Sequence, residues 1–81
     1  MKGINKYVND VTTDMSQKIL GVEYRAHLSK KLMVNDYLIK EEQNKIHIRR
    51  NLCEKYRNNK EMINNVIYEA LLHVGEKDEY R

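Results

Sequence analysis

The residue types that most often carry catalysis or bind metals are few in this chain. It contains three histidines and one cysteine, at His27, His47, His73 and Cys53. None of these residues lies three or four positions from another, although structural zinc sites usually show such close ligand pairs. We therefore expect no metal and no cofactor. We interpret Cys53 as a small core residue rather than a nucleophile.

The carboxylates and glycines show no catalytic pattern either. Glu41 and Glu42 are adjacent, so on a helix their side chains diverge by about 100° and do not form a general acid–base pair. Only three glycines occur, and they form no glycine-rich loop that would hold a phosphate. These residues predict a protein that is not an enzyme.

Length and composition limit the class of protein. A chain of 81 residues suits a single domain, and one cysteine excludes an internal disulfide framework. No apolar run approaches the roughly 18 residues that a membrane span needs. The first residues are polar rather than an apolar signal core. We expect a protein of the cytoplasm, that of the host cell if a phage encodes it.

Two segments have the apolar periodicity of an amphipathic helix. From residue 4 to residue 20, apolar side chains recur every three or four positions, and Gly21 follows as a residue suited to end a helix. A second stripe covers residues 63–74 and is followed by Gly75. The pattern predicts a single helical domain over residues 1–75 and a charged C-terminal tail over residues 76–81.

The segment after Gly21 also favours a helix. Tyr24, Leu28 and Leu32 repeat at four-residue spacing, which predicts a helix over residues 22–34. Whether residues 22–42 form one long helix or two short ones stays open, because a polar Asn-Asp pair suits both a turn and a new helix start.

Residues 44–50 stay open between strand and helix. Lys-Ile-His-Ile-Arg at residues 45–49 alternates polar with apolar side chains, which is the period of a strand. Ile39, Ile46 and Cys53 are instead seven positions apart, a spacing that suits a narrow helical seam. A strand here would need a partner strand for its backbone groups.

The available apolar residues predict an all-α fold. The chain has no Phe, Trp or Pro, so its core is built from Ile, Leu, Val and Met. A domain of this size buries only about 60% of the surface that its unfolded chain exposes. Amphipathic helices would leave apolar faces that a second copy could cover. We expect a small bundle of three or four helices that self-associates.

The positive charge is concentrated in the middle of the chain. Residues 25–60 contain ten Lys and Arg but only four Asp and Glu. A basic surface of this kind suits nucleic acid, a nucleotide or an acidic protein. Tyr and Arg are also the residues that most often anchor interfaces. The candidate partner-binding residues are Lys45, His47, Arg49, Arg50, Tyr56 and Arg57.

One part of the chain resembles a known family. Lys-Ile-His-Ile-Arg-Arg-Asn-Leu at residues 45–52, followed by Met-Ile-Asn-Asn-Val-Ile-Tyr-Glu-Ala-Leu at residues 62–71, resembles the ribbon-helix-helix repressors. In that family, one strand from each of two subunits pairs into a ribbon that enters the major groove of DNA. The alternative fold is then ribbon-helix-helix-like, α with one short strand at 45–49. The alternative function is a transcriptional repressor that binds DNA through residues 45–50.

The resemblance also implies a direction for each side chain of that strand. Lys45, His47 and Arg49 would face the bases, and Ile46 and Ile48 would turn into the core of the dimer.

In size and composition the chain looks similar to accessory proteins of phages and plasmids. Such proteins commonly bind and block a protein of the host. We therefore expect a small non-enzymatic regulatory protein that binds and modulates a macromolecular partner, with a host protein as the first expectation. Nucleic acid or another anionic partner is the second.

Overall fold

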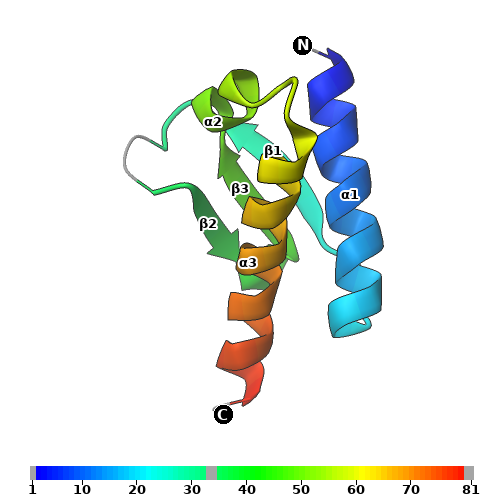
Figure 1. Cartoon of the computed structure of the whole chain (residues 1–81). Helices are drawn as coiled ribbons and strands as arrows, with labels where there is room; N and C mark the ends of the chain where they lie inside the picture. The colour runs from blue at the N-terminus through cyan, green and yellow to red at the C-terminus, as the bar shows by residue number, and fades with distance from the viewer. Residues whose placement is uncertain (1, 33–34, 80–81) are drawn as a thin grey trace.

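The computed structural model describes residues 2–32 and 35–79, and for residues 2 and 76–79 it describes the backbone only (Figure 1). Its elements are α1 (Lys2–Leu20), β1 (Arg25–Ser29), β2 (Tyr37–Lys40), the 3-10 turn η1 (Glu41–Gln43), β3 (Lys45–Arg49), α2 (Arg50–Lys55) and α3 (Lys60–Glu79). The fold is α+β, so the predicted all-α helical bundle is wrong.

The three strands form one mixed sheet in the order β1-β3-β2. β3 is the central strand, parallel to β1 and antiparallel to β2. β1 and β2 lie on opposite sides of β3, so the chain crosses from one edge of the sheet to the other between them. We call the described residues of this connection, 30–32 and 35–36, the crossing segment. The backbone N–H of Arg49 donates to the carbonyl oxygen of Asp36 at 2.8 Å, which ties this crossing segment to the end of β3.

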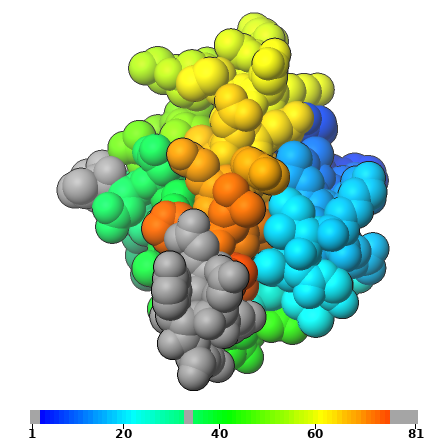
Figure 2. All heavy atoms as spheres, turned by 60° about the horizontal axis from the view of Figure 1, so that its bottom comes forward, coloured from blue at the N-terminus to red at the C-terminus, as the bar shows by residue number. Residues whose placement is uncertain are grey.

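Helices α1 and α3 pack on one face of the sheet. They lie side by side and run in the same direction (Figure 1), and Figure 2 shows α3 between α1 and β2. Ile46 and Ile48 of β3 have no exposed surface, and neither do Ile63 and Ile67 of α3. The core therefore lies between this helical layer and one side of the sheet.

The two terminal helices follow the sequence prediction closely. α1 ends at Leu20, and Gly21 adopts a φ of 75°, a conformation that glycine tolerates best. α3 continues through Gly75 to Glu79, so the second glycine does not end its helix. Residues 80 and 81 of the predicted tail lie outside the described residues.

The middle of the chain differs from the sequence prediction. The helix expected over residues 22–34 is replaced by β1, and the later part of 22–42 contains β2 and η1. Residues 33 and 34 of that predicted helix lie outside the described residues. The open choice at residues 44–50 is resolved as a strand, β3, and α2 follows it directly.

The central position of β3 explains why the alternative fold, the ribbon-helix-helix-like one, is wrong. The strand does alternate as that resemblance implies, with Ile46 and Ile48 buried and their neighbours partly exposed. However, both edges of β3 are paired within the same chain, with β1 and β2. β3 therefore has no free edge for a strand of a second subunit, and its isoleucines fill this chain's own core.

The apolar stripes of α1 and α3 are covered by the sheet and by each other. Self-association stays a prediction. The exposed large apolar side chains do not lie on a single element but are spread over several. They are Ile19, Val22, Leu38, Met62, Tyr68 and Leu72. Within the described ranges, no helix combines the length and the apolar character that crossing a membrane requires.

Polar side chains of α1 hold the backbone at the start of β1. The N–H of Tyr24 donates to Ser16 Oγ at 2.8 Å, and Thr13 Oγ1 donates to the carbonyl oxygen of Tyr24 at 3.1 Å. Two residues further, the N–H of Ala26 donates to Asn9 Oδ1 at 3.0 Å. α1 thus occupies the outer edge of β1, which protects an edge strand from unwanted pairing.

Replacement of Ser16 by alanine tests this attachment. Ser16 is fully buried, so the Ser16→Ala variant leaves the buried N–H of Tyr24 without its acceptor. We expect the free energy of unfolding to fall by about 1–3 kcal/mol, measured by urea denaturation. Gln17→Ala, at an exposed position of the same helix, should change it by less than about 0.5 kcal/mol. Equal effects of the two substitutions would contradict the proposed attachment.

Candidate functional site

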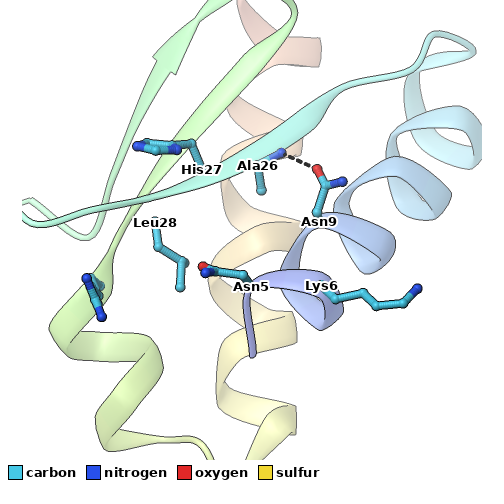
Figure 3. Close-up of a pocket in the computed structure, with 7 residues that line it drawn as sticks. Asn5, Lys6, Asn9, Ala26, His27 and Leu28 are labelled. Carbon is cyan, nitrogen blue, oxygen red and sulfur yellow. Dashed lines mark hydrogen bonds between the residues drawn. The ribbon is translucent and has the colours of Figure 1, made fainter. Parts of the chain in front are cut away.

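The face of the sheet opposite the helices carries most of the charge of the strands. Side chains alternate along a strand, so the neighbours of the buried Ile46 and Ile48 point away from the core. In Figure 3, His27 likewise lies on the opposite side of β1 from Ala26 and Leu28. We call this surface the open face. It consists of Arg25, His27, Ser29, Leu38, Lys40, Lys45, His47 and Arg49.

Three cations lie side by side on the open face. Arg25 of β1 and Lys40 of β2 are both register partners of Lys45 on the central strand. Among the described residues, no carboxylate forms an ion pair with any of the three. Like charges directly opposite each other on adjacent strands destabilise a sheet by about 0.2–1 kcal/mol per pair. We call these three residues the cation row, and it is a local excess of positive charge.

Two histidines and a leucine form the next row. His27 and Leu38 are the register partners of His47. The two imidazole rings meet edge to face, with centroids 5.2 Å apart. Burial lowers the pKa of His47, and the nearby His27, Lys45 and Lys40 lower it further. The open face therefore has a neutral imidazole beside the cation row at neutral pH.

The carboxyl end of the sheet carries two arginines that have ion-pair partners. Arg49 donates from Nη2 to Asp36 Oδ1 at 2.9 Å, and Arg50 donates from Nε to Glu54 Oε2 at 3.2 Å. The first pair joins the crossing segment to β3, and the second lies along the first turns of α2. Both arginines thus stabilise the end of the sheet as well as adding charge there.

A hollow of about 450 Å³ lies at the carboxyl ends of the two parallel strands. We call it the basic hollow. Its lining combines the two histidines with the basic residues of the crossing segment and of α2: His27, Leu28, Ser29, Lys30, Lys31, His47 and Arg50. Lys30 and Lys31 are exposed and form no ion pair with a described carboxylate. The hollow therefore suits an anion.

The structure brings together four of the six residues predicted to bind a partner. Lys45, His47 and Arg49 share the open face, and Arg50 lines the adjoining hollow. The other two are not on the open face. Tyr56 lines a cavity of about 380 Å³ between α2 and α3, which Arg49 also lines, and the exposed Arg57 lies near the start of α1.

Sequence reasoning did not predict β1 and β2, which carry five of the eight residues of the open face. The prediction places Arg25 and His27 in a helix over residues 22–34, and Lys40 in the range 22–42 that stays open. A usable signal was present, because Arg-Ala-His-Leu-Ser at residues 25–29 has the same pattern as Lys-Ile-His-Ile-Arg at residues 45–49. The two segments pair in that same register, with a histidine opposite a histidine.

No metal centre is found in the part of the chain that the structure describes, where His, Cys, Asp and Glu nowhere gather in threes. Cys53 is fully buried in α2 against the core. Its pKa is raised to about 11, by burial and then by the nearby Glu54. A thiol with this pKa holds its proton at neutral pH, so it is not an activated nucleophile.

Comparison with protein-family models, with curated proteins and with solved structures finds no match for this chain.

The lowered pKa of His47 predicts a pH dependence of stability. In the unfolded chain His47 titrates near its ordinary value of 6.5, and folding lowers that value. The unfolded state then binds more protons below pH 6.5, so the free energy of unfolding is highest above this pH and falls as the pH drops through it. Urea denaturation between about pH 7.5 and pH 5 measures the loss. A His47→Gln variant should lose less stability over this range, and an unchanged pH dependence would contradict the assignment.

The burial of Cys53 predicts slow thiol chemistry in the folded protein. At about pH 8 we expect iodoacetamide to alkylate Cys53 slowly under native conditions and rapidly in urea, because only unfolding exposes the thiol and restores its ordinary pKa. Mass spectrometry over time gives the rate. Rapid and complete alkylation of the native protein would show that Cys53 is accessible and reactive.

Proposed function

We propose that this protein is a non-enzymatic binding protein that holds single-stranded nucleic acid on its open face. The observation that carries the proposal is the cation row, in which Arg25, Lys45 and Lys40 lie in register without carboxylate partners among the described residues. A phosphate backbone supplies the missing negative charge, and its neutralisation releases condensed counterions.

The composition of the open face favours nucleic acid over an acidic protein. Protein interfaces have an apolar centre from which charged residues are depleted. On the open face, Leu38 is the one large apolar side chain in the described strands, and it lies beside His47 and two residues from Lys40. Nucleic-acid interfaces are in contrast polar and strongly positive. The host-protein partner expected from the sequence becomes the alternative outcome of the test.

The shape of the open face favours a single strand over a duplex. The helices α1 and α3 lie on the other side of the sheet, so neither extends from the open face into a groove (Figure 1). Unpaired bases instead lie flat against ring-bearing side chains, while cations follow the backbone. The neutral His47 and the exposed His27 offer such rings next to the cation row.

Removal of two cations from the row tests the proposal. We expect the Lys40→Gln/Lys45→Gln variant to bind a labelled single-stranded oligonucleotide more weakly than the parent. The slope of log affinity against log salt should fall by about 1.4, at about 0.7 per lost phosphate contact. Fluorescence anisotropy over a salt titration measures both quantities, and circular dichroism checks the fold. A duplex of the same sequence should bind more weakly than the single strand.

The matched control removes two charges from other surfaces. Lys18→Gln/Lys60→Gln changes the net charge equally, at exposed positions on α1 and α3. We expect this control to keep the parent's affinity within about twofold, because its lysines lie on the helices α1 and α3 and not on the strands of the open face. Equal losses in the two variants, or no binding of any oligonucleotide at low salt, would overturn the proposal.

A further inference from the structure

Two histidines lie in register in the middle of the open face. His27 of β1 and His47 of β3 are register partners, and their rings meet edge to face with centroids 5.2 Å apart. Figure 3 shows His27 on the side of β1 away from Asn5 and Asn9 of α1. We call these two residues the histidine pair. Histidine is the side chain whose charge changes between about pH 5 and pH 8, so the charge of the open face depends on the protonation of this pair.

Cations flank the histidine pair on two sides. The cation row lies on one side, and the basic hollow, whose lining includes both histidines, lies on the other. The cationic groups of the surrounding elements are Arg25 of β1, Lys40 of β2, Lys45 and Arg49 of β3, Lys30 and Lys31 of the crossing segment, and Arg50 of α2. The acidic groups at this end of the sheet, Asp36 and Glu54, pair with arginines.

Neither imidazole forms an ion pair with a carboxylate of the residues that the structure describes. A proton on the histidine pair therefore adds positive charge to a surface that already has an excess of it. In the free protein this environment opposes protonation: burial lowers the pKa of His47 below its ordinary value of 6.5, and His27, Lys45 and Lys40 lower it further.

A phosphate backbone on the open face reverses the effect of these cations. It places negative charge beside the same groups that lower the pKa of His47, and a nearby opposite charge favours the protonated imidazole. A ligand that raises a pKa when it binds is itself bound more tightly in the protonated state. The sign is therefore fixed: binding takes up a proton, and acid strengthens it.

We propose that the histidine pair is a further phosphate contact of the open face, one that forms when the pair takes up a proton. The inference rests on the function proposed above. A backbone that joins the cation row to the basic hollow passes over the pair, because the pair lies between them in the register of the strands. A protonated imidazole donates from both ring nitrogens and forms charge-assisted hydrogen bonds with phosphate oxygens. These donors lie in the plane of the ring, so its faces stay available to a base.

Binding measured over a pH series tests the inference. The probe is a thymine oligonucleotide of about twelve residues without a terminal phosphate. Neither its bases nor its phosphodiesters titrate between about pH 7.5 and pH 5.5, where histidine does. We expect the affinity of the parent to rise about tenfold over this range at constant salt, the effect of one pKa that binding raises by about one. The slope of log affinity against log salt should steepen by about 0.7, for one more phosphate contact.

The third histidine of the chain supplies the matched control. In fluorescence anisotropy with a label that does not titrate, the His27→Gln/His47→Gln variant should lose the gain in acid and keep its affinity at about pH 7.5 within about twofold, because it keeps the cation row. His73→Gln should keep the whole gain, because His73 is exposed on α3, against Tyr37 and on the helical side of the sheet. Circular dichroism at each pH checks that all three proteins are folded.

The outcomes separate this inference from the function on which it rests. A parent that binds the strand at neutral pH without a gain in acid, or a gain that survives in the double variant, overturns the proton-dependent contact and leaves the cation row intact. Failure of the parent to bind at any pH in low salt overturns both. If the double variant does not fold, the parent's salt slope decides, and an equal slope at the two ends of the pH range overturns the contact.

Discussion

The attachment of β1 to α1 is the constraint on which the rest of the structure depends. β1 is an edge strand, and one of its sides has no neighbouring strand. Ser16, Thr13 and Asn9 supply hydrogen bonds to its backbone from the side chains of a helix. Because buried backbone groups must be paired, these three polar residues allow β1 to lie against the helical layer. Without β1, the open face would lose one of its three strands.

The register that follows from this attachment also determines the chemistry of the open face. β1 is parallel to β3 with Ala26 beside Ile46, and this register also determines which side chains are neighbours on the other face. A basic residue meets a basic residue, and a histidine meets a histidine. The apolar alternation that fills the core therefore produces the cation row on the opposite side of the same strands.

The sequence predicts the terminal helices well because their apolar side chains recur with an unambiguous helical period over several turns. It fails at β1 because Tyr24, Leu28 and Leu32 are four residues apart, which is one helical turn but also two periods of a strand. This spacing favours the helix predicted over residues 22–34, which would include Arg25 and His27. The candidate site was predicted in part, since the alternation at Lys45–Arg49 was recognised, while its neighbours depend on long-range pairing that a local pattern does not reveal.

Stability and binding are opposed on the open face. The cation row places like charges opposite each other, and the lowered pKa of His47 shows that this environment disfavours a further positive charge. A fold selected only for stability would place carboxylates among these lysines, as α1 does for Lys6 and Lys18. A polyanion that neutralises the row removes the repulsion and adds its binding free energy to the folded state. This like-charge repulsion in the free protein supports the proposal that the open face binds an anionic strand.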